Sequence, residues 1–264
     1  MFATTRDGTK IGYSLLGDIN STKRVALVHS LAMDREFWRP VAEKLGNACA
    51  TLIYDCRGHG ASDKPKGPYT TALFADDLAD LMDHLGWFKA AVAGASMGGT
   101  VSITFGQNYP ARTTALGLFD TTAWYGETAP KDWADRADKA KAEGLSGLIG
   151  FQKTRWFSDS FREKHADVVD RAIAVFLKNE VAAYAETCTM LGTTDLRSGL
   201  AAMKMPVRIA VGEEDYATPV AMSQTLQAAL PGAPLHIIKG GRHLTPLETP
   251  DVIATEIRSL LGLQ

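Results

Sequence analysis

The chain has 264 residues, 45% of them hydrophobic, which suits one large α/β domain around a single core. A formal net charge of -2 and a pI near 6.3 exclude the strongly basic surface typical of proteins that bind nucleic acid or anionic membranes. No apolar run approaches the roughly 20 residues that span a bilayer, and the N-terminus does not resemble a secretion signal. We therefore expect a cytoplasmic protein that acts on a small molecule.

The first predicted element is a β-hairpin that pairs residues 2–5 with 10–16, because Asp7-Gly8 supplies the positive φ angles of a tight turn. Short runs that are apolar on both faces follow, as is typical of central strands in a parallel sheet covered on both sides. These runs are residues 25–28, 50–54, 90–93, 115–119, 207–211 and 235–238.

Helical patterns separate these runs, most clearly where Phe74, Leu78 and Leu85 fall on one stripe and aspartates fill the opposite face. Alternating strands and helices imply right-handed βαβ units and a mostly parallel, doubly wound sheet, with functional residues at the carboxyl ends of the strands. The predicted fold class is therefore α/β.

The alternation stops between residues 124 and 196, where only helix-like segments rich in Ala, Lys, Asp and Glu occur. We interpret residues 124–196 as a helical cap inserted into a core made of residues 1–123 and 197–264. The alternative is that these are ordinary packing helices with buried tryptophans. Three scattered cysteines, Cys49, Cys56 and Cys188, are predicted to be reduced structural thiols.

The strongest motif is Gly94-Ala95-Ser96-Met97-Gly98, which follows an apolar strand and opens a helix. A nucleophile elbow needs this context, because the serine occupies a strained turn and the residues two before and two after it must be small. The helix N-terminus also favours negative charge that develops at the site. Ser96 is therefore the predicted nucleophile.

A serine hydroxyl needs a base and an orienting carboxylate, which this kind of sheet delivers in the order Ser, acid, His. His243 follows the 235–238 strand after two glycines and is the predicted base. Asp215 follows the 207–211 strand and is the predicted acid, with Glu213 and Glu214 as alternatives in the same loop. His84, His165 and His236 are not placed to reach Ser96.

Stabilising a tetrahedral oxyanion needs two backbone N–H donors, one after the nucleophile and one in the loop after an early strand. Met97 supplies the first. Leu31, in the loop His29-Ser30-Leu31-Ala32-Met33, is the predicted second donor.

With these residues the chain resembles the α/β-hydrolase superfamily and, within it, the 3-oxoadipate enol-lactonase branch. The likeness also includes residues 54–62, Trp156-Phe157, Asp195-Leu196-Arg197, residues 212–219 and residues 243–248. It implies an α/β-hydrolase fold with a cap, and Asp215 as the acid. Such lactonases usually have Asn-Ser-Leu-Gly-Thr where this chain has residues 29–33.

The predicted activity is hydrolysis of a lactone or carboxylic ester through an acyl-enzyme. Ser30, Trp124, Arg155 and Trp156 are predicted to bind the substrate, and the lactonase resemblance suggests a substrate carboxylate held by Arg155. The alternative for Arg155 is a solvated helix face. No cofactor or metal site is predicted, because the chain has neither a phosphate-binding glycine loop nor a metal-ligand cluster.

Other functions fit the same residues. One is a hydrolase that cleaves C–C bonds, and another is a ligand receptor that keeps the triad but turns over slowly. A perhydrolase side activity is compatible with the same triad. The sequence does not indicate an oligomeric state.

Overall fold

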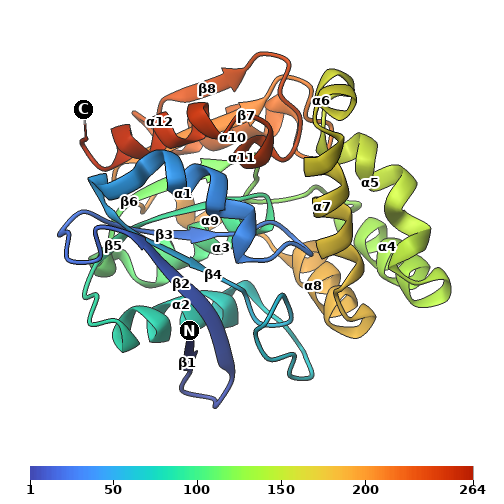
Figure 1. Cartoon of the computed structure of the whole chain (residues 1–264), viewed down its shortest axis with the longest axis horizontal. Coiled ribbons are helices and arrows are strands. Elements are labelled where there is room, and N and C mark those ends of the chain that lie inside the picture. Colours follow the sequence, from blue (N-terminus) through green and yellow to red (C-terminus); the bar gives the residue numbers. More distant parts are fainter. Residues whose placement is uncertain (264) are drawn as a thin grey trace.

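One eight-stranded sheet, ordered β1-β2-β4-β3-β5-β6-β7-β8, organises the molecule (Figure 1). The computed structural model describes residues 1–263, so Gln264, the last residue of the predicted core, lies outside the described residues. The strands are β1 (Phe2–Thr4), β2 (Lys10–Gly17), β3 (Arg24–Val28), β4 (Ala50–Tyr54), β5 (Ala90–Ala95), β6 (Thr113–Phe119), β7 (Val207–Gly212) and β8 (Leu235–Ile238). β1 and β2 run antiparallel to their neighbours, whereas β3 to β8 are parallel. The predicted α/β fold is confirmed, with its antiparallel edge.

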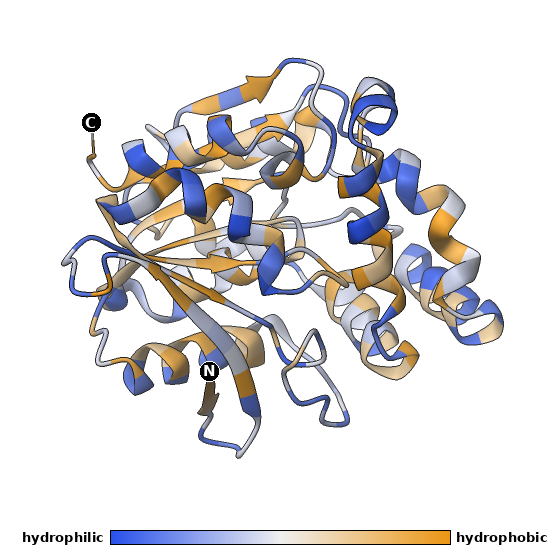
Figure 2. Ribbon diagram, viewed as in Figure 1, coloured by the Kyte–Doolittle hydropathy of each residue, from blue (hydrophilic) through white to orange (hydrophobic). Residues whose placement is uncertain are grey.

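Helices cover both faces of the sheet. α1 packs against α12, and α2 packs against α3 on the opposite face (Figure 1). Every residue of β4 and β5 is buried, as expected for strands covered on both faces, and both strands are mostly apolar (Figure 2). The helices flanking the sheet are α1 (Arg39–Leu45), α2 (Thr71–His84), α3 (Met97–Asn108), α9 (Arg197–Leu200), α10 (Val220–Ala229), α11 (Thr245–Glu248) and α12 (Pro250–Leu260), with short 3₁₀ turns η1 (Arg35–Trp38), η2 (Gly46–Ala48) and η3 (Pro110–Arg112).

A helical segment, residues 124–196, lies between β6 and α9 and gathers at one end of the sheet (Figure 1). Its ends lie side by side: Trp124 and Asp195 form an isolated antiparallel bridge, and Leu196 N–H donates to the Ala123 carbonyl at 2.9 Å. The chain thus leaves and re-enters the sheet region at one place. The segment contains α4 (Ala129–Glu143), η4 (Leu145–Leu148), α5 (Ile149–Trp156), α6 (Asp159–Lys164), α7 (Ala166–Leu177) and α8 (Val181–Thr193).

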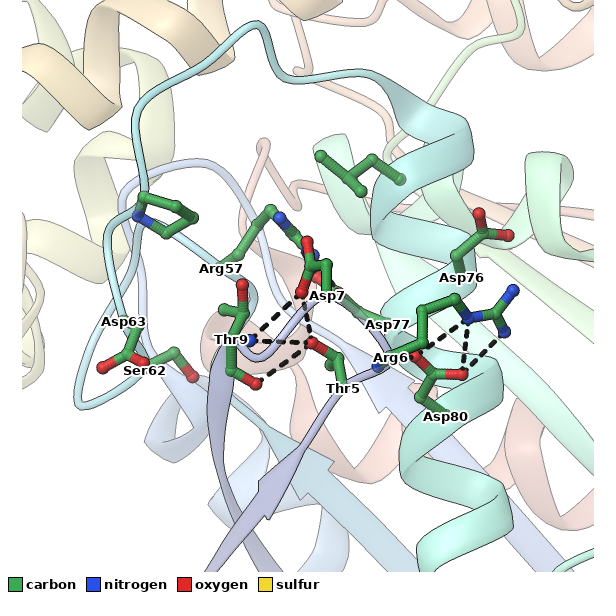
Figure 3. A network of polar contacts seen from close by, with 12 residues as sticks. Thr5, Arg6, Asp7, Thr9, Arg57, Ser62, Asp63, Asp76, Asp77 and Asp80 are labelled. Atoms are coloured by element: carbon green, nitrogen blue, oxygen red, sulfur yellow. Dashed lines mark hydrogen bonds and ion pairs between the residues drawn. The ribbon is translucent and has the colours of Figure 1, made fainter.

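A polar network ties the N-terminal hairpin to α2 (Figure 3). Buried Arg57 donates from Nε to Asp77 at 2.6 Å and lies 2.9 Å from Asp7 in the hairpin turn. Arg6 pairs with Asp80 of α2 at 2.6 Å. Burial raises the pKa of Asp77 to about 6, although Arg57 opposes the rise. The network fixes the loop after β4 and contains none of the residues predicted to form the site.

Two further predictions from the sequence can be compared with the structure. Among residues 1–263 no helix is both long and apolar enough to cross a bilayer. Cys49, Cys56 and Cys188 are all buried and free, as predicted for structural thiols.

Candidate active site

Ser96 occupies a sharp turn between β5 and α3. Its backbone has φ 55° and ψ -120°, a conformation that costs energy for a residue with a Cβ. The flanking glycines are required sterically: a Cβ at Gly94 would lie 2.1 Å from the Gly98 carbonyl oxygen, and one at Gly98 would lie 2.0 Å from the Val28 oxygen. The strained elbow expected from the sequence is therefore present, and it aims Ser96 at the carboxyl edge of the sheet.

Three buried side chains form a continuous hydrogen-bonded chain at this edge. Ser96 Oγ lies 2.9 Å from His243 Nε2, and His243 Nδ1 lies 2.8 Å from Asp215 Oδ2. The backbone of His243 is held by the helical segment, because the N–H groups of His243 and Leu244 both donate to the Trp156 carbonyl at 3.2 and 3.1 Å. The geometry brings together the predicted nucleophile, base and acid.

Asp215 is fixed as an anion by its own loop. Its Oδ1 accepts from the N–H groups of Ala217 and Thr218 at 2.7 and 2.9 Å, and its Oδ2 accepts from the Thr218 hydroxyl at 2.8 Å. Burial alone raises the pKa of Asp215, but His243 and these hydrogen bonds outweigh it and hold the pKa below its usual range. The alternatives point elsewhere: Glu213 accepts from Gly240 N–H, and Glu214 pairs with Arg242.

Asp120, a second buried carboxylate after β6, has no hydrogen bond to the imidazole among the described residues. It accepts from Thr245 N–H and Oγ1 at 3.1 and 2.6 Å and from Gly212 N–H at 3.1 Å. Burial raises its pKa well above the usual range, and the neighbouring Asp215 adds to that rise. Asp120 thus links the loops that carry Asp215 and His243, without contacting His243.

The loop after β3 is braced next to Ser96. His29 spans it, with Nδ1 2.8 Å from the Ser30 carbonyl and Nε2 accepting from Cys56 N–H at 2.9 Å. Ala32 has φ 59°, and its carbonyl accepts from Asn179 Nδ2 at 2.8 Å. Within residues 1–263 the Leu31 N–H donates to no acceptor. Met97 opens α3, where a helix N–H has no partner in the preceding turn.

A small cavity connects the sheet edge to the helical segment. Of the residues predicted to bind substrate, Ser30, Arg155 and Trp156 line it, together with Leu31 of the predicted oxyanion pair. The complete lining is Ser30, Leu31, Ser96, Tyr125, Trp133, Arg136, Gln152, Arg155, Trp156, Thr218 and His243. A larger groove between α1 and α7 contains none of the triad residues, so size alone does not mark the site.

Trp124 lies outside this lining. The Arg197 guanidinium carbon stands 3.6 Å from the centre of its ring, and the bridge to Asp195 fixes its backbone. The three histidines set aside from the sequence also have other neighbours: His84 contacts Tyr13, His236 pairs with Glu256, and His165 stacks on Phe161.

Two arginines in the cavity have no carboxylate partner among the described residues. Arg155 makes no ion pair, and its guanidinium lies 5.4 Å from the ring of Phe151. Arg136 donates from Nε to the Tyr184 hydroxyl at 2.5 Å and lies over the Trp133 ring at 5.1 Å. Burial, together with repulsion from Arg136, lowers the pKa of Arg155 to about 10. The cavity therefore holds two positive charges next to the nucleophile.

A family model described as "Alpha/beta hydrolase family" matches residues 25–256. The chain belongs to the α/β-hydrolase family. It is 28% identical to 3-oxoadipate enol-lactonase 1 of Acinetobacter baylyi, over 94% of this chain and 91% of that protein. This bears out the lactonase resemblance seen in the motifs.

Solved structures agree with this membership. The enol-lactonase from Burkholderia xenovorans superposes with a TM-score of 0.93 at 29% identity, covering 99% of this chain and 100% of that one. A thermophilic esterase from Thermogutta terrifontis, solved with malate bound, gives 0.92 at 26% identity, covering 99% and 97%. These three relatives of this α/β-hydrolase are named as lactone or ester hydrolases, which supports a small ester or lactone as its substrate.

Sequence reasoning missed Tyr125, Trp133, Arg136 and Gln152 in the cavity of this α/β-hydrolase. For Tyr125 a signal existed, because it follows β6 closely and so belongs to the carboxyl edge of the sheet. The other three lie on α4 and α5, where no motif marks the face turned to Ser96. Within the described part of the chain, no group of three or more His, Cys, Asp or Glu side chains is placed to hold a metal ion.

Proposed function

We propose that the protein hydrolyses a carboxylic ester or lactone through an acyl-enzyme on Ser96. His243 Nε2 takes the proton of Ser96 Oγ as the oxygen attacks the carbonyl carbon, and Asp215 stabilises the resulting imidazolium. The N–H groups of Leu31 and Met97 donate to the oxyanion. His243 returns the proton to the departing oxygen, and water then releases the acid by the same steps.

The observation that carries this proposal is the hydrogen-bonded chain of 2.9 and 2.8 Å from Ser96 through His243 to Asp215. A serine is activated when a base lies within hydrogen-bond distance of its hydroxyl and a carboxylate fixes the orientation of that base. In this proposal residues 124–196 act as a cap over a core of residues 1–123 and 197–264. The support for a cap is that α4 and α5 supply the cavity wall opposite the sheet.

We propose further that the substrate carries a carboxylate. Arg155 and Arg136 line the cavity without any acidic partner, and an uncompensated pair of cations favours an anionic ligand. The A. baylyi relative is named for an enol-lactone of an oxo-acid, and the T. terrifontis esterase was solved with malate, a dicarboxylate. Ser30 and Trp156 are the remaining substrate-binding residues in this proposal, whereas Trp124 serves to hold Arg197.

A pair of substrates of equal size tests both parts of the proposal. The protein is assayed with an acidic lactone or ester and with its neutral analogue, and turnover of either supports a hydrolase. Arg155→Ala should raise KM for the acidic substrate by about 10- to 100-fold, the loss of one charge-assisted hydrogen-bonded pair, and should barely affect the neutral one.

Arg171→Ala is the matched control, since it removes a charge from α7 outside the cavity. Equal effects of Arg155→Ala on the two substrates would refute carboxylate recognition and leave a neutral-ester hydrolase. Absence of sustained turnover with every ester and lactone would refute the hydrolase itself.

A further inference from the structure

The hydroxyl of Tyr125 is buried, and no other group of the described protein forms a hydrogen bond with it. The ring is nevertheless fixed, packing edge-on against Trp133 with centroids 5.3 Å apart. Upstream, the Thr122 hydroxyl bonds to both the N–H and the carbonyl of Trp124, which sets the turn before Tyr125. A rigidly held, unpaired buried polar group calls for an explanation.

The position of this hydroxyl suggests a ligand. Tyr125 lines the cavity that contains Ser96 and His243, and the nearby hydroxyls already have partners. Ser96 is bonded to His243, and Thr100 Oγ1 donates to the Thr122 carbonyl at 3.3 Å. By contrast Tyr54, another buried phenol without a partner, lies in β4 away from the cavity. A substrate bound in this cavity can complete the hydrogen bonding of Tyr125 where it stands.

The position of Tyr125 relative to Ser96 indicates which oxygen of the substrate its hydroxyl can contact. In the sheet, β5 lies between β3 and β6, so the segment that carries Tyr125 and the loop that carries Leu31 leave strands on opposite sides of β5, and both residues line the cavity at Ser96. The oxyanion is drawn toward Leu31. His243, which follows β8, lies on the same side as Tyr125 and delivers its proton to the departing oxygen.

The phenol acts as a donor and not as a base. Burial raises the pKa of Tyr125. The nearby Thr100 and Ser96 hydroxyls, which form no well-aligned hydrogen bond with the phenol, and the Arg155 charge only partly oppose the rise, so the proton stays in place at neutral pH. Such a donor can stabilise charge on an oxygen without transferring its own proton.

We propose that Tyr125 is a catalytic residue whose hydroxyl donates a hydrogen bond to the departing oxygen of the bound ester or lactone. This inference rests on the proposed function. As the C–O bond of the tetrahedral intermediate breaks, its electron pair passes to that oxygen, which receives its proton from His243 Nε2 and is stabilised by the phenol. Tyr125 ends the step still protonated. The contact matters most when the departing oxygen is strongly basic.

The test is a series of esters with one acyl group and leaving groups from p-nitrophenol through phenol and trifluoroethanol to ethanol. Tyr125→Phe should leave kcat/KM for the p-nitrophenyl ester nearly unchanged and lower that for the ethyl ester by about tenfold, one hydrogen bond's worth. A plot of log kcat/KM against leaving-group pKa should therefore become steeper. Tyr54→Phe, which deletes an equally buried unpaired hydroxyl, should reproduce the wild-type slope.

Thermal unfolding of both variants checks the fold, which is expected to persist because neither deleted oxygen has a protein partner. The same loss for every leaving group, or no loss at all, would overturn the inference. Ser96→Ala distinguishes the two levels of failure. If this variant is inactive while the Tyr125→Phe slope is unchanged, only the role of Tyr125 fails; if it is active, the proposed function fails.

Discussion

At the scale of single residues, the two buried carboxylates near the imidazole, Asp215 and Asp120, have different hydrogen-bond partners. Asp215 accepts from His243 and from its own loop, whereas Asp120 accepts from Thr245 and Gly212 and has no contact with the ring. Position after a strand does not separate them, because both follow strands at the same edge of the sheet. The hydrogen bonds do separate them, and they assign orientation of the base to Asp215 and bracing of the loops to Asp120.

Asp215→Asn should therefore lower kcat by on the order of 10⁴, because an amide favours the wrong imidazole tautomer, while leaving the melting temperature nearly unchanged. Asp120→Asn should do the reverse, lowering the melting temperature with a far smaller effect on kcat, since the amide nitrogen cannot accept the bonds that Asp120 accepts. Steady-state kinetics and thermal unfolding of both variants measure this ranking. The opposite ranking would move the acid to Asp120.

At the scale of elements, the helical segment is hydrogen-bonded to the loops that carry the proposed site residues. The last residue of α5, Trp156, accepts both backbone N–H groups at His243 and Leu244, and Asn179 after α7 holds the carbonyl of Ala32. Ala32 has φ 59°, a region disfavoured for any residue with a side chain, and lactonases of the type that the chain resembles usually have glycine at this position. The amide of Asn179 helps to keep the Leu31 loop in that conformation.

Asn179→Ala should consequently lower kcat/KM by about tenfold through displacement of the Leu31 donor, since small errors in oxyanion geometry are costly. Lys178→Ala changes the neighbouring exposed residue and should leave kcat/KM as in wild type. The two variants are compared on one neutral ester, which avoids charge effects. A normal kcat/KM for Asn179→Ala would show that the loop keeps its shape without this contact.

At the scale of the whole molecule, the strands and the triad could be predicted from the sequence, whereas most of the cavity could not. The parallel strands are short, mostly apolar runs, and the residues that follow such runs meet at one edge. For this reason Ser96, Asp215 and His243 could be chosen without coordinates. Arg136 lines the cavity with Ser96 because of the angle at which α4 packs in the folded protein. The hydrophobic pattern of a helix in the sequence does not determine that packing angle. The same limit explains Trp124, whose ring turns to Arg197 and away from the cavity.

The buried His29 makes global stability depend on pH. Burial lowers the pKa of its ring to about 4 from 6.5, so between these values the unfolded chain binds more protons at this site than the folded one. The contribution of His29 is complete above pH 6.5 and is lost as the pH falls toward 4. Asparagine, which the resembled lactonases have at this position, does not titrate.

The free energy of unfolding of wild type minus that of His29→Asn should thus decrease by on the order of 1 kcal/mol per pH unit below pH 6.5. Urea unfolding of both proteins at pH 7, 6 and 5 measures the difference, in which the titration of groups that do not interact with His29 cancels; the neighbouring His59 is the group that does interact. A difference that stays constant with pH would mean that the His29 ring is not held neutral.

The most direct test of the account is covalent labelling of Ser96. A fluorophosphonate reacts with a serine only when a base activates its hydroxyl, so intact-mass analysis should show one adduct per chain, peptide mapping should locate it at Ser96, and ester hydrolysis should disappear in proportion. Ser96→Ala should take up no label and lose activity by on the order of 10⁴ or more. Hydrolysis that survives stoichiometric labelling of Ser96, or that persists in Ser96→Ala, would contradict the acyl-enzyme mechanism.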